Sequence, residues 1–188
     1  LLAKNKIGYV NLSKLVSLSY LDNSKDSNPH IKFDNLEYSS KGLICLAGGE
    51  LGLVTKNFRE NNPIKSNGII QKLVKYFNDD FFIEIQRKND ENSRDLGYEN
   101  YLLNLSIKQK IPIVATNENY FLDKKFYNSH DALLSISQQK YIDTEDRIKS
   151  NVDSYLKDPD EMCELFSDLP QACLNSLSIA KKCCFFLN

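Results

Sequence analysis

The sequence has 188 residues, the size of one domain or of two small ones. Hydrophobic residues make up 41% of it, with 10 Phe and 10 Tyr, which is enough for a packed core and excludes wholesale disorder. Its 24 basic and 25 acidic side chains give a formal net charge of -1, which excludes a global positive field that would hold nucleic acid. No apolar run approaches the roughly 20 residues of a membrane-spanning helix, so we expect no membrane partner.

The cysteines and the first residues indicate the compartment. The five cysteines form an odd set without a C-x-x-C pair, and the adjacent Cys183 and Cys184 can bridge only through a strained ring. The first residues, from Leu1 to Lys6, carry neither an initiator Met nor the pattern of a secretory signal. We therefore expect a reduced, cytoplasmic chain that is cut from a longer polypeptide.

The first half of the chain predicts helices alternating with strands. Asn11 is a candidate cap for a helix whose apolar residues recur at three-to-four spacing. Residues 43–47 are typical of a short buried strand, and the glycines of 48–52 indicate a sharp turn after it. Apolar positions four apart predict a helix over 68–77, and 81–85 reads as the next strand.

The second half repeats this alternation. Helical spacing over 98–105 precedes an apolar strand pattern at 112–116. Further helices are expected from 131 to 136 and from 161 to 166. The predicted buried stripe of a last helix consists of Cys173, Leu177, Ala180 and Cys184. Repeated strand–helix units predict an α/β fold: a mostly parallel sheet, or an incomplete barrel, with helices outside.

Two acidic residues are the candidates for chemistry. Glu84 in one strand and Glu118 just after another are expected at the carboxyl ends of parallel strands, where α/β folds place their sites. The competing interpretation, which we favour for Glu84, is a partly buried acid paired with a Lys or Arg. Because His30 and His130 are the only histidines, a metal centre within this chain would need carboxylates.

Other polar features favour ordinary structural roles. His30 is expected to be exposed, and Asp131 is expected to interact with free N–H groups at a helix start. The segment 48–52 lacks the Gly-Lys-Ser/Thr ending of a phosphate-binding loop, so a plain turn is favoured. No nucleophile elbow occurs, and the cysteines are expected in the core. Aromatic residues over 120–127 leave two alternatives open, a surface that stacks nucleic-acid bases or part of the core.

A larger pattern joins these segments. In order along the chain, they resemble segments of the amino-terminal PHP (polymerase and histidinol phosphatase) domain of bacterial DNA polymerase III alpha subunits. The strands carry that family's "GLI-L-G", "Y-E-Q" and "IP-VATN" patterns. The resemblance covers nearly the whole chain and rests on Leu1 to Asn5, Gly8 to Ser17, Gly42 to Gly48, Phe82 to Gln86, Ile111 to Asn117, His130 to Ile136, Tyr155 to Lys157, Glu161 to Ala172, Asn175, Ile179 and Ala180.

The resemblance implies a place within a larger enzyme. Residues 1–188 would form the carboxyl-terminal part of a PHP domain, a distorted β/α barrel with mostly parallel strands and outer helices. The first strands and the His-x-His motif would be absent, and the helical end would lead towards the polymerase palm. The palm aspartates that bind the catalytic Mg²⁺ lie outside these residues. We therefore expect no catalytic residue and no cofactor in this segment, with Mg²⁺ serving the parent polymerase.

Departures from the family pattern concern the metal site. Metal-binding members carry Asp-His where this sequence has Arg87-Lys88, and Asp-x-His-Tyr where it has Glu118 to Phe121. Lys88 and Tyr120 thus replace the expected histidines, and neither is a good ligand for zinc or manganese. Glu84 and Glu118 remain as remnant metal ligands. The resemblance therefore predicts a degenerate site in which the trinuclear cluster does not form.

Three functional hypotheses follow. The favoured one is a structural module of a DNA-directed DNA polymerase, inactive by itself, which docks the proofreading exonuclease subunit and the rest of the alpha chain and meets DNA through the parent subunit. The alternative is a metal-dependent phosphoesterase or 3′-5′ exonuclease in the intact PHP domain, with a metal-bound water as nucleophile. The weakest, given the balanced charge, is a free-standing nucleic-acid binding domain.

Overall fold

The computed structural model describes residues 1–23, 28–50, 52–88 and 95–186. Leu51, within the predicted glycine turn, lies outside these residues. The elements in chain order are β1 (Leu2–Ala3), α1 (Lys6–Leu21), α2 (Asn35–Ser39), β2 (Leu43–Ala47), α3 (Leu53–Arg59), α4 (Pro63–Phe77), η1 (Asn78–Asp80), β3 (Phe81–Gln86), α5 (Leu96–Gln109), β4 (Ile113–Thr116), η3 (Lys124–Phe126), α6 (Tyr127–Ser137), α7 (Pro159–Leu165) and α8 (Pro170–Lys182).

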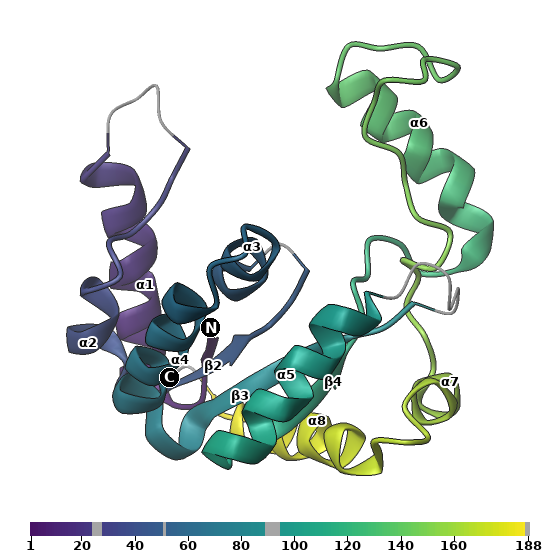
Figure 1. Ribbon diagram of the computed structural model, residues 1–188. Helices are drawn as coiled ribbons and strands as arrows, with labels where there is room; N and C mark the ends of the chain where they lie inside the picture. The colour runs from purple at the N-terminus through teal and green to yellow at the C-terminus, as the bar shows by residue number, and fades with distance from the viewer. Residues whose placement is uncertain (24–27, 51, 89–94, 187–188) are drawn as a thin grey trace.

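The strands form one sheet in the order β1-β2-β3-β4 (Figure 1). The short β1 pairs antiparallel with β2, whereas β2, β3 and β4 are parallel. In register, Ala47 lies opposite Ile83, and Ile83 lies opposite Ile113. This confirms an α/β fold with mostly parallel strands. Among the described residues the sheet is open, so the barrel stays a prediction.

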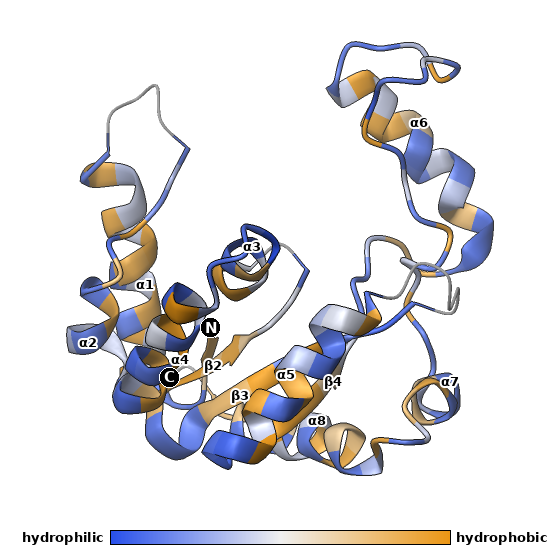
Figure 2. Cartoon of the chain, viewed as in Figure 1, coloured by the Kyte–Doolittle hydropathy of each residue, from blue (hydrophilic) through white to orange (hydrophobic). Residues whose placement is uncertain are grey.

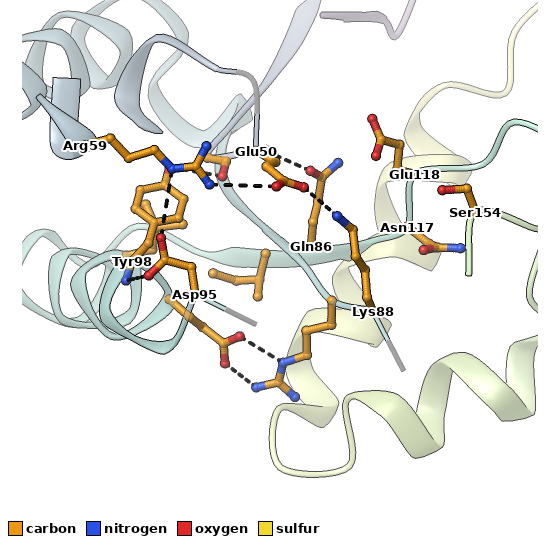
Figure 3. Close-up of a pocket in the computed structure, with 14 residues that line it drawn as sticks. Glu50, Arg59, Gln86, Lys88, Asp95, Tyr98, Asn117, Glu118 and Ser154 are labelled. Atoms are coloured by element: carbon orange, nitrogen blue, oxygen red, sulfur yellow. Dashed lines mark hydrogen bonds and ion pairs between the residues drawn. The ribbon is translucent and has the colours of Figure 1, made fainter. Parts of the chain in front are cut away.

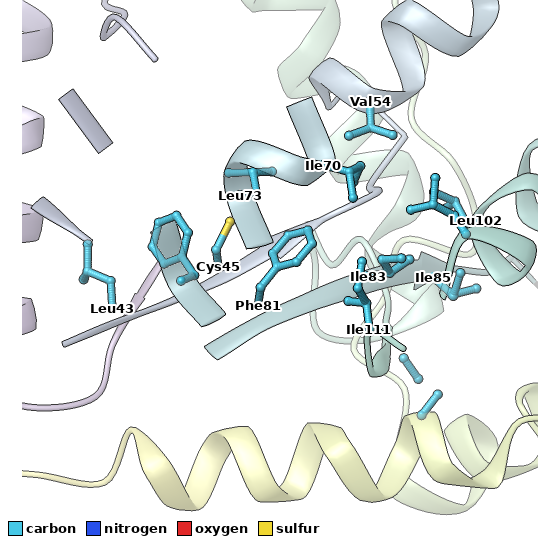
Figure 4. Close-up of a cluster of buried hydrophobic side chains, with 14 of the residues drawn as sticks. Leu43, Cys45, Val54, Ile70, Leu73, Phe81, Ile83, Ile85, Leu102 and Ile111 are labelled. Atoms are coloured by element: carbon cyan, nitrogen blue, oxygen red, sulfur yellow. The ribbon is translucent and has the colours of Figure 1, made fainter. Parts of the chain in front are cut away.

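The sheet is apolar on both faces, as expected for parallel strands covered by helices (Figure 2). Leu43, Cys45, Phe81, Ile83 and Ile85 point to one face and join buried residues of α3, α4 and α5 (Figure 4). The opposite face carries a smaller cluster, in which α8 contributes one buried residue: Ile44, Phe82, Val114 and Ile179. These clusters hold the three parallel strands in place and so fix the positions of their carboxyl ends.

Several helix starts differ from the predictions. Helix α1 begins at Lys6, because Asn5 is the cap: its Oδ1 accepts from Gly8 N at 3.0 Å. Asn11 instead lies within the helix and donates from Nδ2 to Lys41 O at 2.9 Å. Helix α7 begins earlier than predicted, at a capping box formed by Asp158 and Glu161.

The buried face of α8 was predicted wrongly. Leu177 is 54% exposed, whereas Ala172 and Ile179 are the buried residues. The reason is that two polar side chains on the inner face bind the backbone of β4. Asn175 Nδ2 donates to Ile113 O at 2.7 Å, and Ser176 Oγ donates to Ala115 O at 2.7 Å. A search for apolar spacing alone misses such a face.

Helix α6 and the segment that returns from it project away from the sheet (Figure 1). We call residues 122–153 the α6 arm. Its base is closed by a parallel bridge between Phe121 and Tyr155, with Tyr120 N donating to Ser154 O at 2.9 Å. In the part of the chain that the structure describes, no helix has the length and apolar character to cross a membrane.

Candidate functional site

The carboxyl ends of β2, β3 and β4 meet at one edge of the sheet, where a small pocket lies (Figure 3). Its volume is about 90 Å³, room for a few water molecules. It is lined by residues that follow each strand, together with residues of α3, α5 and the base of the α6 arm: among them Glu50, Arg59, Gln86, Lys88, Tyr98, Asn117, Glu118 and Ser154. Polar side chains from segments far apart in the sequence therefore converge here.

Glu84 and Glu118, the predicted remnant ligands, border one larger hollow beside this pocket. Glu84 is half-buried, and its Oε1 accepts from Thr116 Oγ1 at 2.7 Å and from Gln86 Nε2 at 3.5 Å. Its hydrogen-bond partners are thus neutral groups, not the Lys or Arg that the sequence favoured. Glu118 accepts from the Tyr120 hydroxyl at 2.6 Å, and this bond raises the pKa of Tyr120.

Lys88 lies at the same edge but reaches across the pocket to the segment after β2. Its Nζ donates to Glu50 Oε2 at 2.9 Å. Arg59 approaches the other oxygen of Glu50 at 3.8 Å and also contacts Asp95 Oδ2 at 4.0 Å. The cation that replaces an expected histidine therefore belongs to a chain of alternating charges that ties β3, the loop after β2 and α3 together.

The loop after β2 is a tight turn, as predicted, and two hydroxyls that the sequence did not single out hold it. Gly52 N donates to Gly49 O at 2.9 Å, and Gly48 has a φ of 131°. The buried hydroxyls of Thr55 and Tyr98 lie 2.6 Å apart and reach the carbonyls of Gly49 and Gly48 at 2.6 and 3.1 Å. Burial raises the pKa of Tyr98 to about 12, so its proton stays in place.

Arg87 lies at the border of the pocket, where its side chain forms a buried clasp. Its guanidinium donates to Glu99 Oε1 at 2.6 Å, to Asp168 Oδ2 at 2.8 Å and to Leu165 O at 3.0 Å, and it lies 4.8 Å from the ring centroid of Phe166. The hydrogen bond to Asp168 is the main cause that raises the pKa of Arg87. This residue joins the end of β3 to α5 and to the α7–α8 connection.

The α6 arm contains an ion pair on its inner side. Asp131 accepts from two Arg147 nitrogens, at 2.8 and 2.5 Å, and from Ser150 N at 2.9 Å. The predicted role of Asp131 at a helix start is wrong, because α6 begins four residues earlier at Tyr127. The hydrogen bond from Arg147 lowers the pKa of Asp131 to about 2.

The outer side of the arm is apolar. Leu133 and Ile136 are 64% and 72% exposed, whereas Asp131 and Ser135 on the inner face are 7% and 4% exposed. Helix α6 therefore has the reverse of the usual pattern of apolar residues inside and polar residues outside. At the base of the arm Leu122 and Phe126 are 68% and 42% exposed, so the core interpretation of these two residues is wrong.

Two further predictions about chemistry have outcomes. His30 is exposed, as predicted, whereas Cys163 and Cys184 are exposed and not in the core. Cys45 is buried, and burial raises the pKa of its thiol to about 11, which keeps it protonated near neutral pH. At the strand ends, charged residues are mainly used to hold segments of the chain to one another.

The donor set does not fit a metal cluster. Over the described ranges, no three His, Cys, Asp or Glu side chains gather as ligands for one ion. Glu84 and Glu118 each accept a hydrogen bond from a hydroxyl group, and Lys88 supplies a positive charge at the same edge. These residues by themselves do not fit a trinuclear centre, and we derive no reaction step through one.

Comparisons with known proteins agree on one family. Residues 1–88 match the PHP domain family. The chain is 36% identical over 188 residues to DNA polymerase III subunit alpha of Caulobacter vibrioides. This match covers 100% of the chain and 16% of that protein. It is 35% identical over 184 residues to the same subunit of Borreliella burgdorferi and 34% identical over 186 residues to that of Vibrio cholerae. In each case the match covers 97% of the chain, which spans 16% of these relatives.

Proposed function

Because the chain is a relative of the DNA polymerase III alpha subunits, with a PHP-domain segment at residues 1–88, we propose that it belongs to the catalytic subunit of a bacterial replicative polymerase. In this proposal the whole of residues 1–188 is the carboxyl-terminal part of the PHP domain. Nucleotidyl transfer and its Mg²⁺ ions belong to a palm outside these residues. The segment described here has a structural role and docks the proofreading exonuclease subunit.

The outward apolar face of α6 is the observation that carries the docking role. Burying an exposed Leu or Ile side chain contributes about 1.5 to 3 kcal/mol, so a helix that leaves both outside gains from a covering surface. The inner Asp131–Arg147 pair fixes which face points outwards. Near the tip of the arm Asp143, Glu145 and Asp146 are balanced by Lys140, Arg147 and Lys149, so the tip has no net positive charge that would favour DNA as the covering partner.

The test uses the full alpha subunit and the purified exonuclease subunit. Leu133→Asp and Ile136→Asp place a charge in the proposed interface and are expected to weaken the complex at least about tenfold each, because central apolar residues dominate binding. Asn128→Asp, also exposed and at the start of the same helix, away from Leu133 and Ile136, is the matched control and is expected to change the affinity little. Binding is measured by surface plasmon resonance, with primer extension to check that the polymerase is intact. Unchanged affinity in both apolar variants would reject this face as the docking site.

A hydrolytic function is the second candidate, and it is supported by the position of Glu84 and Glu118 beside one hollow. It requires further ligands from upstream residues of the intact PHP domain. In that case the full subunit releases nucleotides from single-stranded DNA with Mn²⁺ or Zn²⁺, and Glu84→Ala abolishes the release. Exposed Glu60→Ala is the matched control. Release that survives Glu84→Ala comes from a contaminant. Bound metal that Glu84→Ala and Glu118→Ala both remove would favour hydrolysis over the structural role.

A further inference from the structure

Two cysteines from neighbouring helices lie side by side at the α7–α8 connection. Cys163 is on α7 and Cys173 is on α8, and the two helices pack against each other. The Cys173 Sγ lies 3.8 Å from the carbonyl oxygen of Met162, the residue before Cys163. Cys163 directly follows Met162 on the same turn of α7, and its thiol is a further cause, after burial, that raises the pKa of Cys173.

The surroundings of the two thiols differ. Cys163 is exposed to solvent, whereas Cys173 is partly buried, and burial raises its pKa. A dissolved oxidant therefore reacts with Cys163 first, and Cys173 remains a thiol close to it. An exposed cysteine next to a second thiol is the arrangement in which oxidation proceeds to a disulfide rather than to higher sulfur acids.

We propose that Cys163 and Cys173 are a reversible oxidation site that forms a disulfide between α7 and α8. Hydrogen peroxide is the oxidant. The Cys163 sulfur attacks one peroxide oxygen, the O–O bond breaks, and a sulfenic acid and one water form. The Cys173 sulfur then loses its proton and attacks the Cys163 sulfur, and the displaced hydroxide takes that proton to leave as a second water. Two thiols are oxidised and one peroxide is reduced.

The disulfide would close a loop around the α7–α8 connection, the segment that Arg87 binds in the buried clasp. Between the two cysteines lie Leu165 and Asp168, both of which accept hydrogen bonds from Arg87. A covalent link between Cys163 and Cys173 closes this segment into a loop and so restricts it in the unfolded chain. Oxidation is therefore expected to raise the thermal unfolding midpoint of the protein, and reduction with dithiothreitol is expected to reverse the rise.

The experiment treats the natively folded full-length chain with hydrogen peroxide, blocks the remaining thiols and digests with trypsin and Asp-N without reduction. These proteases separate Cys163, in residues 160–167, from Cys173, in residues 168–181. The expected result is a linked pair of these two peptides, lost on reduction and lost in Cys163→Ser and Cys173→Ser. Cys184→Ser, also at an exposed cysteine, is expected to retain the link.

Three results would overturn the proposal. They are a Cys183–Cys184 disulfide that forms while Cys163 and Cys173 stay reduced, a Cys163 link between two chains, and conversion of Cys163 to sulfinic acid with Cys173 unchanged. Because Cys163 is exposed, its serine variant is expected to fold, and its unfolding midpoint is then insensitive to peroxide. A peroxide-induced rise that persists in Cys163→Ser would also contradict the proposal.

Discussion

Replacing Arg87 by Met tests whether the buried clasp supports the fold. The Arg87 side chain is 2% exposed, and that of its partner Glu99 is 12% exposed. Removing one partner of a buried ion pair costs about 3 to 5 kcal/mol, because the other charge stays away from water. The Asp168 side chain is 62% exposed and is readily hydrated when Arg87 is removed. Its contribution to the loss of unfolding free energy is therefore small. We therefore expect the free energy of unfolding to fall by about 3 kcal/mol, the lower end of that range, mainly because Glu99 loses its partner.

The assay is urea unfolding followed by far-ultraviolet circular dichroism. With a denaturant slope of roughly 1 to 3 kcal/mol per molar urea, a loss of about 3 kcal/mol lowers the midpoint by roughly 1 to 3 M. Lys88→Met is the matched control at the next residue, since it removes a partly exposed ion pair with Glu50 and is expected to cost less than about 1 kcal/mol. Glu99→Gln in the Arg87→Met background is expected to recover part of the loss, because it removes the buried charge.

The result that would refute this reasoning is equal destabilisation by Arg87→Met and Lys88→Met. A second refutation would be a double variant that is less stable than Arg87→Met alone. The first outcome would mean that the buried position of Arg87 adds nothing to the strength of its ion pairs. The second would mean that the loss comes from packing against Phe166 and not from the charge of Glu99.

Further predictions concern the glycines and the arm. Gly8→Ala is expected to destabilise the protein strongly, because a Cβ at this position would lie 1.8 Å from Gly42 O. Gly68→Ala is also in a helix, but a Cβ there would have nothing within 4 Å, so it is expected to stabilise the protein by about 0.5 to 1 kcal/mol. Thermal unfolding of the two variants compares these effects. The pKa of Asp131 is lowered from 3.8 to about 2, so its contribution to the stability of the α6 arm is present above about pH 4 and lost as the pH falls towards 2. Amide hydrogen exchange of residues 127–150 is therefore expected to accelerate over that range, after correction for intrinsic rates, and Asp131→Asn is expected to remove this dependence.

The parallel strands were predictable from the sequence because the signal is local. Short runs of apolar residues mark β2, β3 and β4, and each prediction falls within one residue of the observed bounds. The turn after β2 was equally visible, since its glycines have a simple backbone role. The strand predicted from Pro112 begins one residue later, at Ile113, because Pro112 has no N–H to donate.

Long-range partners account for what the sequence did not predict. Arg87 was interpreted only as a replaced metal ligand, because Glu99 and Asp168 lie 12 and 81 positions away and no periodicity links them to it. The inner face of α8 was not predicted for a similar reason. Its Asn175 and Ser176 donate hydrogen bonds to the backbone of β4 instead of forming an apolar stripe. Glu84 was located correctly in its strand, but its neutral partner Thr116 became visible only through the pairing of β3 with β4.

The two polar side chains of α8 also govern how the sheet can associate. Strand β4 is an edge strand, and its outward carbonyls at Ile113 and Ala115 already accept hydrogen bonds from Asn175 and Ser176. An added strand would have to displace α8 on that side, so among the described residues β1 is the more accessible edge of the sheet. Growth into a fibril needs two pairing edges on each molecule. Pairing through β1 alone joins two molecules and then stops, because the β4 edge of each is already occupied by α8.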